Sequence, residues 1–374
     1  MEVGLLLFGD LTQPSGGFLY DRYLSDALLR AGHRVQLISQ PPGMDYATQR
    51  RYGRNAPEPG AAIRERSLDV LVADELNHAS AGPALARLSR LRPRPTIVGL
   101  VHHLRVDEAR WAPRTLADER RFLRACDAWL CNSTATLSRV RRVARAPRSS
   151  AVVHPGSGGI GYASGADGGV EPATAPSSAT RPAAGSAVRV LTVGTVIPRK
   201  NIHGLISACV ALNRRRPGSV ELRVAGDLSV APDYVRDLRR QLQRSPADGS
   251  IRLLGRLEPR QLQEEYRAAE LFVLPSFHEG FGIVLLEALA NGLPVIATSR
   301  GGAVDIVRPE RDGLLVDPRR RGALGRALGR MSADAAFRER CAREALRRAA
   351  MFADWERSMN GAVRFLETMA GRGG

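Results

Sequence analysis

The chain contains few cysteines, and their spacing excludes two common kinds of site. The four cysteines are Cys126, Cys131, Cys209 and Cys341. They form no CxxC pair and have no histidine at a ligand spacing, so the sequence predicts neither a zinc site nor a disulfide framework. Scattered single cysteines are typical of a reducing compartment, and we expect a cytoplasmic protein.

Long hydrophobic runs are also missing. No stretch reaches the roughly 18 uninterrupted apolar residues of a transmembrane helix. Residues 1–10 carry Glu2 where a secretion signal has basic residues, and their apolar stretch is short, so they indicate a buried first strand. The chain has 374 residues, of which 44% are hydrophobic and 25% charged. This length and composition predict a globular protein of two domains.

Acidic residues are outnumbered, since 55 lysines and arginines face 38 acidic residues and give a formal net charge of +17. Three explanations remain open, namely solvated helix faces, contact with an anionic membrane or acidic substrate, and nucleic-acid binding. Nucleic acid is the least favoured partner, because no binding motif accompanies the spread-out arginines and only 5% of residues are aromatic. A membrane-facing surface would involve helical segments around Arg120, Arg121, Arg124, Arg139, Arg141 and Arg142.

Two parts of the chain alternate strand-like and helix-like segments, as parallel α/β sheets do. In residues 1–155 the strand-like segments are VGLLLFGD, HRVQLIS, LDVLVAD, PTIVGLVHH and AWLCNS. In residues 188–351 they are VRVLTVG, VELRVAGD, IRLLG, AELFVLPS and PVIATS. Residues 156–187 between them are nearly all Gly, Ala, Ser, Pro and Thr and predict a flexible linker. We therefore expect two doubly wound domains, with ligands at the carboxyl ends of their strands and in the cleft between them.

The segment LFVLPSFHEGFGIVLLEALANG, residues 271–292, predicts a strand, a tight loop and a helix. The helix is apolar on every face and should be buried, yet Glu287 lies in its middle. A buried carboxylate needs a basic partner such as an arginine, or a ligand with hydroxyl donors such as a ribose. Glu279 precedes the helix. Gly280 and Gly282 let the backbone approach a ligand, and amides at a helix start favour a diphosphate.

The segment LTVGTVIPRKN, residues 191–201, predicts a strand that ends in glycine and is followed by Arg199 and Lys200. Lys200 is the only lysine of the chain, and all the other residues counted as lysine or arginine are arginines. The exception indicates a need for a compact ammonium group at this position. The alternative is an ordinary charge pair at the start of a helix.

These motifs resemble glycosyltransferase family 4, in which two glutamates separated by seven residues lie in an EGFG loop and its helix. The resemblance extends from Gly16 and Gly17 to the FADWE segment, with the linker excepted. It implies an α/β protein of the GT-B fold, with two Rossmann-like domains facing a central cleft. Residues 1–155 would form the acceptor-side domain and residues 188–351 the nucleotide-sugar-binding domain. A C-terminal helix at about 352–374 would pack back on the first domain.

The resemblance also implies roles for individual residues of the second domain. Arg199 and Lys200 would bind the donor diphosphate and neutralise the leaving group. Glu279 would meet the donor sugar, and Glu287 would hold the nucleotide ribose. The donor would also meet the backbone amides of Gly280, Phe281 and Gly282.

In the first domain the resemblance implies two further contacts with the donor. The loop of Gly16 and Gly17, between the first strand and a helix that stops at Gly32, would face the diphosphate. A histidine at the end of PTIVGLVHH would lie against the donor sugar. His102 is the better match, and His103 is kept as the alternative.

The resemblance implies a retaining glycosyltransferase that moves a sugar from a nucleotide-diphosphate sugar to a glycolipid, a polysaccharide precursor or a small molecule. No DxD-type metal motif lies in a suitable loop, so neither metal nor another cofactor is expected. A nucleotide-sugar epimerase or sugar phosphorylase of the same fold is the first alternative. A basic nucleic-acid-binding protein is the alternative of another class. The expected place is the cytoplasm, with peripheral contact at the inner membrane face as a further hypothesis.

Overall fold

The structure is a computed structural model of the 374-residue chain. It describes residues 1–9, 11, 15–40, 48–51, 67–107, 113–146, 148–157, 187–245 and 249–371. The chain divides into two compact units, and each is described by itself. The first is Met1–Gly156 with Asp354–Gly374, and the second is Ser157–Ala353. Most of the predicted linker, residues 156–187, lies outside the described residues.

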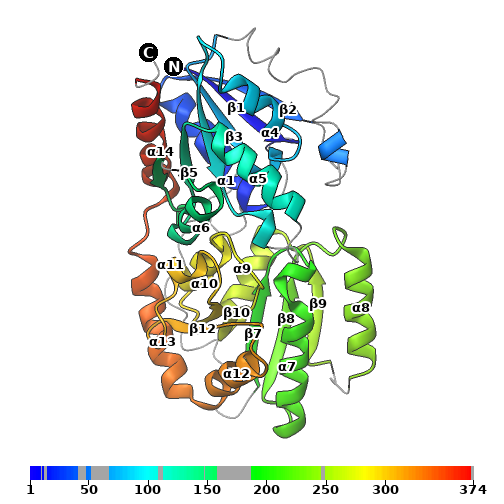
Figure 1. Ribbon diagram of the computed structural model, residues 1–374. Coiled ribbons are helices and arrows are strands. Elements are labelled where there is room, and N and C mark those ends of the chain that lie inside the picture. Colours follow the sequence, from blue (N-terminus) through cyan, green and yellow to red (C-terminus); the bar gives the residue numbers. More distant parts are fainter. Residues whose placement is uncertain are drawn as a thin grey trace. The chain divides into compact units, whose positions relative to one another are not determined.

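A six-stranded parallel sheet forms the centre of the first unit, with the strand order β2-β1-β3-β4-β5-β6 (Figure 1). Its strands are β1 Glu2–Phe8, β2 Arg34–Gln40, β3 Val70–Asp74, β4 Thr96–Val101, β5 Ala128–Cys131 and β6 Ser149–Val152. The first five coincide with the apolar segments that the sequence predicts as strands, and β6 is additional. Every residue of β3, β4 and β5 is buried, as in parallel sheets that helices cover on both faces.

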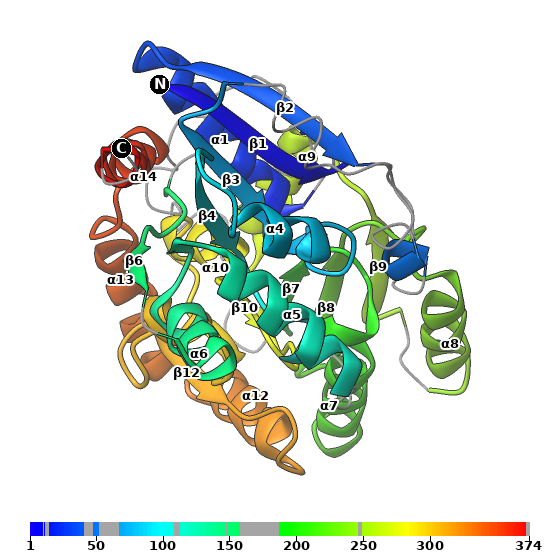
Figure 2. The same cartoon turned by 45° about the horizontal axis from the view of Figure 1, so that its top comes forward.

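The helices of this unit are α1 Gly16–Arg30, α4 Gly82–Leu88, α5 Pro113–Ala125, α6 Thr134–Ala144 and α14 Trp355–Ala370. Side chains of α4, α5 and α6 form one hydrophobic cluster with strand residues such as Leu71, Ile97 and Trp129. Figure 2 shows α4 and α5 in front of the sheet and α1 behind it. The predicted helix stop is present, because α1 ends at Arg30 and Gly32 has a φ of +80°.

The C-terminal helix α14 packs on the first unit, against α1, β3 and β4. The rings of Tyr23 and Trp355 are stacked, with centroids 4.2 Å apart. His33 Nε2 lies 3.0 Å from Glu367 Oε1, near the other end of the helix. Residues 354–370 therefore complete a fold that otherwise consists of the first part of the chain.

The second unit contains another six-stranded parallel sheet, with the strand order β12-β11-β10-β7-β8-β9 (Figure 1). Its strands are β7 Val188–Val193, β8 Val220–Ala225, β9 Ile251–Gly255, β10 Leu271–Leu274, β11 Val295–Thr298 and β12 Gly313–Val316. The helices are α7 Ile202–Arg215, α8 Pro232–Gln243, α9 Pro259–Ala268, α10 Ile283–Ala290, α11 Ala303–Ile306, α12 Ala323–Ala333 and α13 Ala335–Ala349. Helices pack on this sheet in two hydrophobic clusters, one with α7 and α12 and the other with α10 and α13.

In each sheet the chain changes its direction of growth at one place. The first sheet grows from β1 to β2 on one side and then to β3 on the other, and the second grows from β7 to β8 and β9 before β10 returns beside β7. Ligands of doubly wound folds bind outside the carboxyl ends of the strands at such a switch point. Each unit therefore has one sheet edge at which a site is expected. No helix in the described part of the chain has both the length and the apolarity of a membrane span.

Candidate functional site

The two predicted motifs of the second unit meet at its switch point. β7 is followed by a short 3₁₀ turn, Pro198–Lys200, and the neighbouring strand β10 is followed by the loop that carries Glu279 and leads into α10. Lys200 Nζ lies 2.7 Å from Glu279 Oε1, and Arg199 Nη1 lies 3.5 Å from the same oxygen. The structure thus brings Arg199 and Lys200 to Glu279, which lies 80 and 79 positions further along the sequence.

The carboxylate of Glu279 is held at this place by further hydrogen bonds. The Ser276 hydroxyl donates to Glu279 Oε1, and Arg199 Nη1 also donates to the carbonyl oxygen of His278 at 3.0 Å. The Glu279 backbone is held as well, because its N–H donates to Arg300 O and its carbonyl accepts from Gly302 N. Both ends of the residue are therefore fixed before any ligand binds.

Gly301 explains why two glycines follow Arg300. Its φ is +91°, and a Cβ atom there would lie 1.8 Å from the carbonyl oxygen of Glu279. No side chain fits such a gap. The Glu279 loop and the loop after β11 can pair only where no Cβ atom intervenes, so Gly301 allows the backbone contact that holds Glu279 in place.

Two basic side chains control the ionisation of Glu279. Glu279 is only 4% exposed, and burial alone would raise its pKa, but Lys200 and Arg199 outweigh burial and hold that pKa at about 2. The carboxylate is therefore ionised at neutral pH. Both cations contact one oxygen of this carboxylate, so the switch point carries basic side chains that suit an anionic ligand.

The remaining residues of the EGFG loop shape its backbone and do not present a side chain to a ligand. Phe281 is 2% exposed and packs in the core, where its ring meets Phe352 edge to face. Gly282 has a φ of +97° and directly precedes α10. A ligand at this loop would therefore meet main-chain groups of Gly280 to Gly282 rather than the Phe281 side chain.

The prediction that α10 is buried on every face is wrong. Leu285 and Leu286 are buried, whereas Ile283, Val284 and Glu287 are partly exposed. The buried side chains of α10 pack in one hydrophobic cluster with α13 and the sheet, and the rest of the helix surface is only partly covered.

Glu287 has a phenol rather than an arginine as its partner within the described residues. The Tyr266 hydroxyl, from α9, donates to Glu287 Oε2 at 2.9 Å. Desolvation raises the pKa of Glu287 to about 7, although the hydrogen bond from Tyr266 opposes the shift. A carboxylate with this pKa titrates near neutral pH, so a ligand that supplies hydroxyl donors would stabilise its ionised form.

In the first unit, Gly16 and Gly17 do not form the predicted loop, because they are the first two residues of α1, after the N-cap Ser15. A Cβ atom on Gly17 would lie 3.2 Å from His102 Cδ2, so the glycine lets the helix start approach the imidazole. His102 directly follows β4 and is 7% exposed. His103 is more exposed, and its Nδ1 lies 3.6 Å from Glu75 Oε1.

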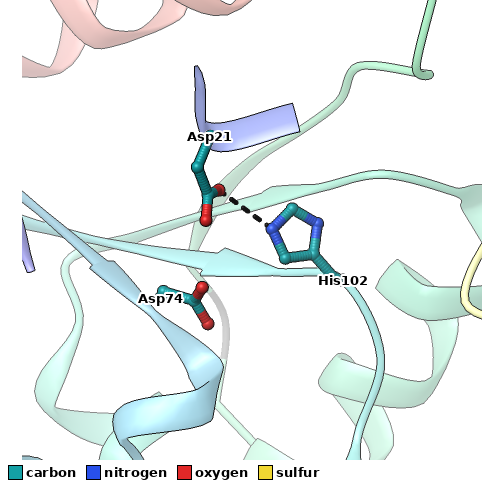
Figure 3. A group of neighbouring side chains, drawn as sticks. All are labelled: Asp21, Asp74 and His102. Atoms are coloured by element: carbon teal, nitrogen blue, oxygen red, sulfur yellow. Dashed lines mark hydrogen bonds and ion pairs between the residues drawn. The ribbon is translucent and has the colours of Figure 1, made fainter. Parts of the chain in front are cut away.

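His102 belongs to a group that the sequence analysis missed. Its Nε2 lies 3.0 Å from Asp21 Oδ1 on α1, and Asp74, the last residue of β3, lies beside them (Figure 3). One ligand-type atom of each residue lies within 4.8 Å of the others, a spacing that can hold a metal ion. A partial signal was present, because Asp74 ends β3 and His102 directly follows the neighbouring strand β4, but no local pattern marks Asp21.

Two family profiles match the chain. The profile of glycosyl transferases group 1 matches residues 180–348, and the profile of glycosyltransferase family 4 matches residues 15–157. The D-inositol 3-phosphate glycosyltransferase of Salinispora arenicola is 36% identical over 179 residues, which are 46% of this chain and 39% of that protein. The O-antigen chain mannosyltransferase B of Escherichia coli is 35% identical over 167 residues, which are 44% of this chain and 42% of that protein. The matches thus span about two fifths of these relatives.

Solved structures match nearly the whole chain. Sucrose-phosphate synthase from Thermosynechococcus elongatus has a TM-score of 0.79 and 21% identity, with 100% of both chains covered. HepE of Anabaena in complex with UDP and glucose has a TM-score of 0.72 and 20% identity, with 98% of this chain and 100% of that chain covered. The fold class predicted from the sequence is confirmed. The chain has the GT-B fold and belongs to the group 1, family 4 glycosyltransferases.

Proposed function

We propose that the protein is a retaining glycosyltransferase that moves a sugar from a nucleoside-diphosphate sugar to an acceptor hydroxyl. The observation that carries the proposal is the pair of cations, Arg199 and Lys200, which faces the single buried carboxylate of Glu279 at the switch point. Two basic side chains at this edge suit a diphosphate, and Glu287 on the adjoining helix suits a ribose. The solved structure of Anabaena HepE in complex with UDP and glucose is consistent with this donor class.

In this mechanism the protein stabilises the leaving group. Negative charge develops on the diphosphate as the bond to the anomeric carbon breaks, and Lys200, Arg199 and the amides before α10 oppose it without reorganisation. The acceptor oxygen then forms its bond to the anomeric carbon on the face that the diphosphate leaves. A phosphate oxygen takes the hydroxyl proton. Metal would have no step to perform.

A panel of donors tests the proposal and its alternatives. The protein is incubated with UDP-, GDP- and ADP-sugars, with and without a lipid extract, and the products are identified by mass spectrometry and by NMR of the anomeric proton. Retention is expected, with product only when the acceptor is present. An isomerised nucleotide sugar or a sugar phosphate would indicate the epimerase or the phosphorylase. Steeply salt-dependent DNA binding without donor binding would indicate the nucleic-acid alternative.

We further propose that arginines of α5 and α6 rest on an anionic membrane surface. Arg120 and Arg124 already donate to the carbonyl oxygens of Val143 and Ala144 at the end of α6, so these two have a structural task. Arg139 and Arg141 also have partners, Asp107 and Ser150 respectively. Arg121 Nη1 lies 3.3 Å from Asp118 Oδ1, but its side chain is 46% exposed. The proposal therefore rests mainly on Arg142 and on the exposed part of Arg121.

Liposome sedimentation tests this surface. Vesicles with anionic lipid should retain the wild type at low salt better than neutral vesicles do. The double variant Arg121→Glu, Arg142→Glu should lose that difference. Arg215→Glu with Arg239→Glu, which changes two exposed arginines of the second unit by the same charge, is the control and should keep most of it. Equal binding to anionic and neutral vesicles would refute the proposal.

A further inference from the structure

Three buried carboxyl groups lie together at the switch point of the first unit. Asp21 and Asp74 are each 1% exposed and Glu75 is 4% exposed. They come from α1, from the end of β3 and from the 3₁₀ turn Glu75–Asn77 that follows it. Burying three negative charges at one place is very costly without compensation.

Arginine does not provide that compensation. Among the residues that the structure describes, no arginine or lysine forms an ion pair with Asp21, Asp74 or Glu75, although the chain is rich in arginine. The basic groups that pair with these carboxyl groups are His102, with Asp21, and His103, with Glu75. Asp21 Oδ2 and Asp74 Oδ2 are buried and have no hydrogen-bond partner. A carboxyl oxygen of Asp21 lies within 4.8 Å of one of Asp74. Unsatisfied acceptors on two groups this close require either a proton or a cation between them.

One proton satisfies both oxygens. A proton on Asp74 can be donated to Asp21 Oδ2, which leaves Asp21 Oδ1 as an ionised acceptor for His102 Nε2, 3.0 Å away. Asp74 Oδ1 remains the acceptor of the Leu76 N–H at 2.7 Å. Burial raises the pKa of both aspartates to about 7, in agreement with a shared proton at neutral pH.

The imidazole of His102 is held so that its two nitrogens have different surroundings. Nε2 points at Asp21 between the helix and the sheet (Figure 3). The Tyr20 ring meets the imidazole edge to face at a centroid distance of 5.3 Å, and Gly17 lies beside Cδ2. Nδ1 is on the opposite edge of the ring from Nε2, away from the carboxyl groups (Figure 3).

We propose that Asp21 and Asp74 share one proton, and that Asp21 thereby fixes His102 as the Nε2–H tautomer, whose Nδ1 accepts a hydrogen bond from a sugar hydroxyl. The inference rests on the proposed glycosyltransferase function. Asp21 and Asp74 are positioning residues that act through His102. The ligand is defined by its chemistry as a hydroxyl donor, and it belongs to either the donor sugar or the acceptor.

The tautomer can be measured in the protein without any substrate. Nitrogen-15 NMR of labelled protein distinguishes a protonated from an unprotonated ring nitrogen, and His102→Gln identifies the signals of His102. We expect Nε2–H in the wild type at pH 7. In Asp21→Leu the buried Nε2 loses its acceptor, so the proton should move to Nδ1.

Two conservative variants separate positioning from packing. In Asp74→Asn the amide takes the place of the shared proton and donates to Asp21, so the tautomer should stay as in the wild type. In Asp21→Asn the amide oxygen can still accept from Nε2–H, so the tautomer should stay there too. Asp26→Asn, an exposed position on the same helix, is the control and should change nothing.

Ligand binding then identifies the source of the hydroxyl. If it belongs to the donor sugar, Asp21→Leu should bind the nucleoside-diphosphate sugar about tenfold more weakly and the nucleoside diphosphate as tightly as the wild type does. If it belongs to the acceptor, donor binding should be unchanged and the KM of the acceptor should rise. Failure of the proposed function would remove both effects but leave the tautomer result.

Three results would overturn the inference. The first is an Nδ1–H tautomer in the wild type. The second is an unchanged tautomer in folded Asp21→Leu, with the fold checked by circular dichroism. The third is micromolar binding of Zn²⁺ or Mn²⁺ to the wild type that Asp21→Leu and Asp74→Asn abolish, because a cation rather than a proton would then join the two carboxyl groups.

Discussion

Lys200 Nζ and Glu279 Oε1 are 2.7 Å apart, so the only lysine of the chain is bonded to the first glutamate of the EGFG loop. The two residues have been assigned separate tasks, one at the diphosphate and one at the sugar. Their contact couples those tasks, because a change at Lys200 also alters the ionisation of Glu279. Mutational effects at the two positions should therefore not be additive.

Lys200→Met deletes the ammonium and keeps much of the apolar stem. The developing charge on the leaving group loses its nearest cation, so kcat should fall about 100- to 1,000-fold, or roughly 3 to 4 kcal/mol. Steady-state transfer at saturating donor measures this, with circular dichroism as a check of folding. Transfer within about threefold of the wild type would mean that Lys200 does not serve the diphosphate.

Lys200→Arg keeps the positive charge and tests whether the shape of the cationic group matters. A guanidinium is a broad planar group, and it cannot place its charge where the compact ammonium of Lys200 meets Glu279 Oε1 at 2.7 Å. We expect an impaired enzyme rather than a restored one. Arg215→Lys, an exposed exchange in the same unit, should leave transfer unchanged.

Glu287→Gln tests the nucleotide contact. An amide accepts ribose hydroxyls less well than a carboxylate, so nucleoside-diphosphate binding should weaken by roughly 1 to 3 kcal/mol. Because the pKa of Glu287 is about 7, wild-type affinity should also rise from pH 6 to pH 8, and the Gln variant should lack that part of the rise. Tyr266→Phe should move the midpoint to higher pH, since it removes a hydrogen bond that lowers this pKa. Calorimetric affinities equal to the wild type would make Glu287 structural.

Chelation should leave transfer intact. Within the described residues, the group with metal-ligand spacing lies in the first unit, and the proposed diphosphate contacts of the second unit are cations. The measurement is transfer rate after dialysis against EDTA. Loss of activity that magnesium or manganese restores would contradict the proposed mechanism.

The paired aspartates should make the first unit less stable at alkaline pH. Asp21 and Asp74 have folded pKa values of about 7, raised from 3.8, so the stability they contribute is complete below about pH 4 and is lost as the pH rises through 7. Titration of the one shared proton should lower the free energy of unfolding by roughly 3 kcal/mol between pH 5 and pH 8. Nearby Glu75 and His102 titrate in the same surroundings, so a variant is needed to isolate the pair.

Asp74→Asn isolates the contribution of the pair, because its amide imitates the protonated acid at every pH. Its urea unfolding should depend less on pH than that of the wild type. All three tryptophans fall within the sequence of the first unit, so their fluorescence reports on that unit. An identical pH dependence in both proteins would show that the aspartates do not titrate in this range.

Most strands could be predicted from the sequence because they are buried on both faces. Continuous apolar runs such as that of β4 Thr96–Val101 show this directly. The two strands that were missed, β6 Ser149–Val152 and β12 Gly313–Val316, have four residues each. β6 is polar in half its length and β12 begins with glycine. Their strand character comes from pairing with β5 and β11, which a local pattern does not contain.

The two candidate sites also depend on contacts between distant segments, which a local sequence pattern does not contain. Lys200 and Glu279 stand out by composition and motif, but their contact depends on β7 and β10 being neighbours, which the order of elements along the chain does not reveal. Asp21 was overlooked because a single acid in an amphipathic helix usually faces water. Only the packing of α1 against the strand ends places it beside His102.

The position of α14 also determines the order in which the protein can be completed during synthesis. The second unit, Ser157–Ala353, is continuous and has all its residues before α14 is made. The first unit begins earlier, but Tyr23 cannot stack on Trp355 until that residue emerges, and the surfaces of α1, β3 and β4 that α14 covers stay exposed until then. Of the two units, the first unit therefore begins earlier in the chain and is completed later.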